Sequence, residues 1–84
     1  MPVRYGSDLA EHEAVRNSAG LFDISHMGEI VVVGPQAKDF LDSKLINLSS
    51  KIAPGRAKYS MLLNESGGII DDLIVYRLSE EEFL

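Results

Sequence analysis

Two stretches of the chain carry the apolar spacing expected of helices. The first covers about residues 8–18, where Ser7 suits the N-cap position and Gly20 suits the C-terminal stop. The second covers about residues 35–45, because apolar residues recur there at intervals of three and four. Its expected buried stripe consists of Ala37, Phe40, Leu41 and Leu45.

Three other stretches have the composition of strands. A β-branched run, Ile30–Val33, predicts a strand over about 28–34. Two later apolar runs, about 57–63 and 69–78, flank the turn residues 64–68 and therefore predict a hairpin. We expect all three strands in one antiparallel sheet, with the second helix covering one face. The fold class that this pattern favours is α+β, an antiparallel sheet with flanking helices.

The second hairpin strand holds two adjacent carboxylates, Asp71 and Asp72, inside its apolar run. Aspartate is depleted from strands, and an unpaired charge among apolar groups is costly, so each of the two needs solvent or a partner. Successive strand side chains point to opposite faces. One face carries Ile70, Asp72, Ile74, Tyr76 and Leu78, and the other carries Ile69, Asp71, Leu73, Val75 and Arg77.

The choice between these two faces decides which aspartate is the better candidate for chemistry. A face that contains Arg77 is expected to have the better route to water, which makes Asp72 the candidate for an inward-facing acid. The competing interpretation is a structural aspartate that accepts hydrogen bonds from backbone amides near the turn.

Composition narrows the possible function classes. Hydrophobic residues make up 45% and charged residues 25%, which is ordinary for a soluble domain, and we expect a cytoplasmic protein. The absence of cysteine excludes disulfides and thiolate metal sites, and His12 with its acidic neighbours lacks zinc spacing. A net charge of −5 argues against a nucleic-acid surface, and no apolar run is long enough for a membrane span. The expectation is no metal, no nucleic acid and no membrane.

Several motifs, taken in order, carry a family resemblance. They are MPVxYGS at 1–7, EHxAVR at 11–16, AGLFDISHMGE at 19–29, GxAxYS at 55–60 and NESGGIIDDLIVY at 64–76. Together they resemble the N-terminal part of the T-protein of the glycine cleavage system, the tetrahydrofolate-dependent aminomethyltransferase. The resemblance covers nearly the whole chain. One departure is Leu48 after Asn47, where family members commonly have an Asn-Asp pair.

The resemblance implies specific roles for a few residues. The second aspartate of the pair is the acid beside the folate, which corresponds to Asp72. Met27 lies in a loop that approaches the folate in the family. Tyr76 is a candidate for the folate pocket because it shares the strand face of Asp72, four residues away, and Tyr59, before the hairpin, is a further candidate. Ordinary core or sheet packing is the competing interpretation for all three. Tetrahydrofolate is the implied co-substrate, and the lipoylated carrier protein of the glycine cleavage system is the implied partner.

The family also bears on how much of the enzyme is present. Its members have three domains, so we expect residues 1–84 to be a partial N-terminal folate-binding domain with both ends truncated. Such a piece is expected to be inactive alone, with the aminomethyltransferase activity belonging to the full-length protein. The alternatives are a folate-dependent demethylase or oxidase domain, or a non-enzymatic folate-binding relative of the same superfamily.

Overall fold

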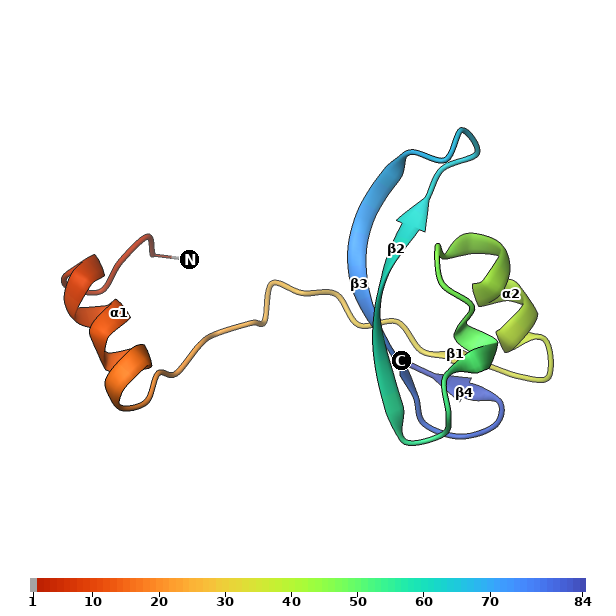
Figure 1. Ribbon diagram of the computed structural model, residues 1–84, viewed down its shortest axis with the longest axis horizontal. Helices are drawn as coiled ribbons and strands as arrows, with labels where there is room; N and C mark the ends of the chain where they lie inside the picture. The colour runs from red at the N-terminus through yellow and green to blue at the C-terminus, as the bar shows by residue number, and fades with distance from the viewer. Residues whose placement is uncertain (1) are drawn as a thin grey trace.

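Residues between 32 and 83 form a small antiparallel sheet. The structure is a computed structural model that describes residues 2–84. Within those residues four strands lie in the order β1–β4–β3–β2 (Figure 1). They are β1 (Val32–Val33), β2 (Arg56–Leu63), β3 (Ile69–Arg77) and β4 (Glu82–Phe83). Each neighbouring pair is antiparallel, which confirms the predicted α+β fold class.

The β2–β3 hairpin is the longest feature of the sheet, and its turn explains its register. The side-chain oxygen Oδ1 of Asn64 accepts hydrogen bonds from the backbone N–H groups of Ser66 and Gly68, at 3.0 and 2.7 Å. Gly67 has a φ of +82°, a conformation that side-chain-bearing residues rarely adopt. The pairing sets Met61 opposite Asp72, with an irregularity between Leu62 and Leu63. The predicted hairpin is therefore confirmed.

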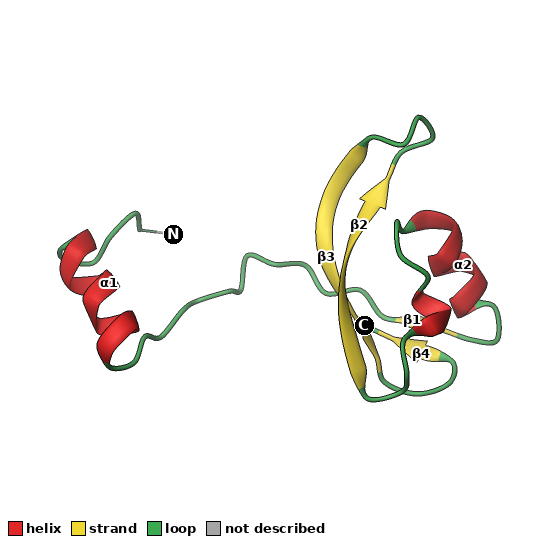
Figure 2. Cartoon of the chain, in the orientation of Figure 1, coloured by secondary structure: helices red, strands yellow, loops and turns green. Residues whose placement is uncertain are grey.

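The core lies on one side of this sheet. The second helix, α2 (Ala37–Lys44), and the short 3₁₀ turn η1 (Ser49–Lys51) lie beside the hairpin (Figure 2). The buried hydrophobic residues are Ala37, Leu45, Ile52, Val75 and Phe83, with Val32, Leu41, Leu62 and Leu73 packed against them. This cluster joins α2 to the strands, as the helical stripe predicted.

One member of that predicted stripe is wrong. Phe40 is 52% exposed, whereas Ala37 is buried and Leu41 packs against the core. The contact follows the i, i+4 row from Ala37 to Leu41, and Phe40 lies about 100° from Leu41 around the helix. Helical spacing alone therefore does not bury a large apolar side chain when the sheet beside the helix is narrow.

The strand predicted over about 28–34 is much shorter than expected. Ile30 and Val31 are exposed, and only Val32–Val33 pairs, with the equally short β4. β-Branched residues form a strand only where a partner offers backbone groups and a surface to pack on. Because β4 contributes two residues, β1 has the same length.

The N-terminal part stands apart from the sheet. Helix α1 (Asp8–Asn17) has no buried residue, and residues 18–31 form an extended connector between it and β1 (Figure 1). The radius of gyration is 16.9 Å, compared with about 12 Å for a compact chain of this length. Ser7 occupies the N-cap position without a side-chain bond. The helix entry is held instead by Glu11, whose Oε1 accepts the backbone N–H groups of Tyr5 and Gly6.

Candidate functional site

The hairpin has two unlike faces. On one face lie Val75 and Arg77, which are buried, with Leu73 packed against the core. The opposite face is open: Ile70, Asp72, Ile74 and Tyr76 on β3 and Tyr59 on β2 are all exposed. We call these five residues the open face. It combines apolar side chains with one carboxylate.

The expected orientation of the two faces is wrong. Arg77 was expected to mark the route to water, but only 6% of it is exposed, and its face is the one that packs into the core. Asp72 is therefore not an inward-facing acid within this chain, since it lies on the open face. The Arg77 face can pack into the core because hydrogen-bond acceptors surround the guanidinium and compensate for the loss of water.

Those acceptors are mostly backbone carbonyls. Nη1 of Arg77 donates to the carbonyls of Ile52 at 2.6 Å and Ser50 at 3.4 Å, and Nε donates to the carbonyl of Ser79 at 3.1 Å. Nη2 donates to the carbonyl of Glu80 at 3.2 Å and to its carboxylate at 2.7 Å. An arginine side chain has five N–H donors, and these five hydrogen bonds use all of them. The guanidinium also lies 5.5 Å from the ring centre of Phe83.

Asp72 has a different environment. The hydroxyl of Tyr59 donates a hydrogen bond of 2.9 Å to Oδ2 of Asp72. This bond, with lesser effects from desolvation and from the negative charge of Asp72, raises the pKa of the Tyr59 phenol above its ordinary value. The hydroxyl therefore keeps its proton and remains a donor at neutral pH. The neighbouring Asp71 accepts the backbone N–H of Asp72 through its own Oδ1 at 3.0 Å.

The loop before β2 holds Tyr59 in place through its backbone. Nδ2 of Asn47 donates to the Tyr59 carbonyl at 2.8 Å, and the N–H of Ile46 donates to the Met61 carbonyl at 3.0 Å. An isolated bridge between Leu45 and Leu62 continues this contact. The loop thus supplies partners to the outer edge of β2. Asn47 had no predicted role, although a lone amide in a loop beside a strand edge is a recognisable signal.

Of the other predicted site residues, Tyr76 lies on the same face as Asp72, whereas Met27 lies in the connector. Tyr76 shares the open face with Asp72, as alternation predicted, and pairs with Ala57 across the hairpin. Met27 lies in the connector of residues 18–31 and is 54% exposed, and it has no contact with the open face among the hydrogen bonds of the described residues. Its backbone N–H donates to the carbonyl of Ile24, which closes a local turn. The structure therefore brings together Asp72, Tyr59 and Tyr76.

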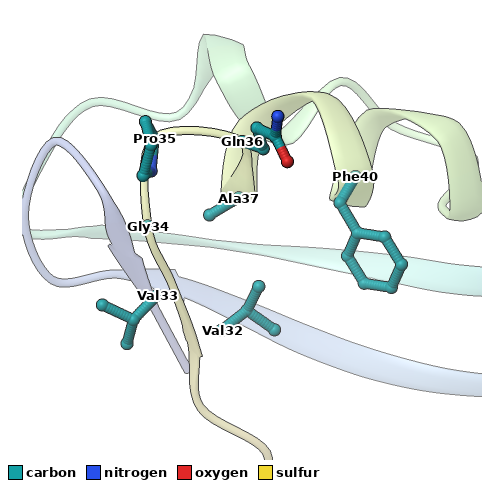
Figure 3. Close-up of a pocket in the computed structure, with 7 residues that line it drawn as sticks. All are labelled: Val32, Val33, Gly34, Pro35, Gln36, Ala37 and Phe40. Carbon is teal, nitrogen blue, oxygen red and sulfur yellow. The ribbon is translucent and has the colours of Figure 1, made fainter.

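A separate hollow of about 410 Å³ lies where β1 meets α2. It is lined by Val32, Val33, Gly34, Pro35, Gln36, Ala37 and Phe40. Figure 3 shows the Phe40 ring and the Val32 side chain bordering this space. The lining has no titratable group and none of the predicted site residues, so the hollow offers no acid–base chemistry.

Within residues 2–84 there is no cluster of three or more histidine, aspartate or glutamate side chains arranged to hold a metal ion. Neither helix in that range has the length and apolar character needed to cross a membrane.

Comparison with known proteins gives consistent results. The family model described as GCVT N-terminal domain matches residues 1–84. The chain is 62% identical to an aminomethyltransferase of Corynebacterium jeikeium and 58% identical to one of Streptomyces coelicolor, in both cases over its whole length. It spans only 22% and 23% of those relatives.

A solved structure agrees with the sequence relatives. The crystal structure of glycine cleavage system aminomethyltransferase T from Bartonella henselae matches with a TM-score of 0.60 and 45% identity. The match covers 63% of this chain and 15% of that one. On the family match over its whole length, this chain belongs to the GCVT N-terminal domain family.

Proposed function

We propose that this chain is part of a tetrahydrofolate-dependent aminomethyltransferase of the glycine cleavage system, and that Asp72 carries its chemistry. The reaction moves an aminomethyl group from the lipoyl arm of the carrier protein to tetrahydrofolate. Ammonia is released, and methylenetetrahydrofolate is formed. The relatives named above support this activity.

The observation that carries the proposal is a carboxylate held on an accessible apolar face. Asp72 is exposed, is flanked on its own strand face by Ile70 and Ile74, and has one oxygen held by Tyr59. A carboxylate offers about four acceptor positions, so one hydrogen bond leaves capacity for a substrate nitrogen. An apolar surround strengthens such a bond once a ligand displaces water.

The chemistry of the reaction needs a group of this kind. The transferred carbon passes through a cationic, iminium-like state, and the folate nitrogens lose protons. A fixed carboxylate stabilises that positive charge and accepts a hydrogen bond from a folate nitrogen. The short side chain of an aspartate on a strand has few torsions, so holding it in one orientation costs little conformational entropy.

The remaining assignments are part of the same proposal. Tyr76 contributes to the folate surface because it shares the open face with Asp72. Met27, which lies in the connector of residues 18–31, is proposed as a further folate contact on the family resemblance. The lipoylated carrier protein is the protein partner, the reaction needs no metal, and the cytoplasm is its compartment.

The test is an assay of the longer protein that contains this chain. Purified enzyme is mixed with aminomethylated carrier protein and tetrahydrofolate, and ammonia release is measured. We expect turnover with the unaltered protein and a large loss in Asp72→Asn. A protein that binds tetrahydrofolate but releases no ammonia would support the non-enzymatic alternative. Oxidation or demethylation of a small N-methyl substrate would support the other alternative.

A companion assay uses residues 1–84 alone. We expect no ammonia release above background, because within residues 2–84 Asp72 lies on an open surface and not in an enclosed site. Turnover by this piece would contradict that expectation.

A further inference from the structure

We propose that Tyr59 is a positioning residue for the reaction, and that its hydroxyl holds the Asp72 carboxylate in its working orientation. This inference rests on the proposed function, because it concerns how the reacting acid is held. It assigns to Tyr59 a role through Asp72, which differs from a plain contact with the folate.

The geometry of the hairpin makes the contact possible. Tyr59 lies directly opposite Ile74, and Asp72 lies directly opposite Met61, so the two side chains are diagonal neighbours on one face. Diagonal pairs are within reach of an aromatic side chain. The result is a hydrogen bond of 2.9 Å from the Tyr59 hydroxyl to Oδ2 of Asp72.

An exposed aspartate needs such a partner to have a single orientation. The carboxylate torsion of aspartate is broad, and Asp72 is not enclosed by packing within residues 2–84. In that range the Tyr59 hydroxyl is the one side-chain donor that bonds its carboxylate. Removing the hydroxyl therefore frees the carboxylate to rotate, while its charge remains.

Tyr59 is itself well anchored. The Asn47 amide bonds its carbonyl at 2.8 Å, and two residues along β2 the Met61 carbonyl accepts the N–H of Ile46 at 3.0 Å. The backbone under Tyr59 is thus held on both edges, by β3 and by the loop. A tyrosine ring has only two side-chain torsions, so an anchored backbone sets the position of the hydroxyl closely.

The decisive experiment is a double-mutant cycle in the longer protein. Tyr59→Phe, Asp72→Asn and the double variant are compared by kcat and by KM for tetrahydrofolate. Loss of a hydrogen bond to a charged group predicts that Tyr59→Phe lowers kcat by about 10–100-fold. KM should stay within about twofold, because folate contacts remain. In the Asp72→Asn background the same change should alter kcat by less than about twofold.

The matched control is Tyr5→Phe, which removes another exposed tyrosine hydroxyl far along the chain. It keeps the backbone bond from Tyr5 to Glu11 and should leave kcat and KM unchanged. A readout independent of turnover is the NMR resonance of ¹³C at the Asp72 carboxyl. It should move in Tyr59→Phe and stay in place in Tyr5→Phe.

Three outcomes overturn the inference while leaving the proposed function intact. They are an unchanged kcat in Tyr59→Phe, an effect of equal size in the Asp72→Asn background, and a raised KM with unchanged kcat. The last outcome would make Tyr59 a direct folate contact. If the unaltered protein releases no ammonia, the proposed function fails, and the carboxyl resonance still decides whether Tyr59 holds Asp72.

Discussion

Each face of β3 carries a charged side chain, but one of the two is buried and the other is exposed. On the core side, Arg77 is a charged group at 6% exposure with every N–H donor engaged, chiefly by backbone carbonyls. On the open face, Asp72 is a charged group with one side-chain partner and access to solvent. The buried charge has no capacity left for a ligand, whereas the exposed one keeps most of its acceptor positions.

This difference separates stability from chemistry along a single strand. Arg77 ties η1 and the turn after β3 to the core, and its partners are fixed backbone groups. The Asp72 carboxylate bonds the exposed Tyr59 hydroxyl and no core group, so we do not expect its charge to be needed for folding. Variants that change one face of β3 at a time test this separation.

The largest effect should come from the two aspartates, measured in the longer protein of the proposed function. Asp72→Asn keeps the shape of the side chain and removes its charge, so kcat should fall by about 10²–10⁴-fold. Asp71→Asn should cost far less, because Asp71 belongs to the other face and accepts only a local backbone N–H. Steady-state ammonia release measures both. Equal losses, or a larger loss at Asp71, would mean that Asp72 is not the reacting acid.

The second effect concerns stability and the core side. Arg77→Met should lower the free energy of unfolding by about 2–4 kcal/mol, since it leaves buried carbonyls without donors. Arg56→Met is the matched control: Arg56 pairs with Arg77 across the hairpin but is exposed, so its cost should stay within about 0.5 kcal/mol. Hydrogen exchange of the β3 amides reports both. Similar protection in the two variants would argue against a structural role for the buried guanidinium.

A smaller difference is expected between adjacent apolar residues. Val75 is 3% exposed and Ile74 is 44% exposed. Val75→Ala should cost about 2 kcal/mol, from lost transfer energy and the cavity that remains. Ile74→Ala removes more atoms but should cost less than half as much. If urea unfolding or hydrogen exchange gives the reverse order, the open face is covered in the protein under test.

The smallest effect is a pH dependence at Tyr59. Its bond to Asp72 raises the pKa of the phenol in the folded protein, so its proton is bound more tightly there than in the unfolded chain. The associated stability is present below the ordinary phenol pKa of about 10 and is lost as the pH rises through the folded value. In Asp72→Asn the Tyr59 titration, followed by NMR of the ¹³Cζ-labelled ring, should move back toward about 10. An unchanged midpoint would show that Asp72 does not set it.

Local rules predicted much of the hairpin from the sequence. The turn residues from Asn64 to Gly68 carry their own hydrogen bonds and a positive φ, so the turn needs little from the rest of the fold. Side-chain alternation is a property of any strand, and it placed Asp72 and Tyr76 together. The family resemblance, carried by ordered motifs, was confirmed by the match over residues 1–84. The catalytic role of Asp72 stays a prediction.

Only the tertiary structure decided which face of β3 is covered. Alternation divides residues between faces, but both faces are mostly apolar, so nothing local tells them apart. The choice depends on carbonyls from η1 and from the turn after β3, which meet Arg77 only after the chain has folded. The hydrogen bond from Tyr59 to Asp72 depends likewise on the register of two strands. The exposure of Phe40 and the shortness of β1 follow from the size of their partners. Patterns in the sequence report what a residue can do locally, whereas burial and pairing depend on which distant groups are brought to it.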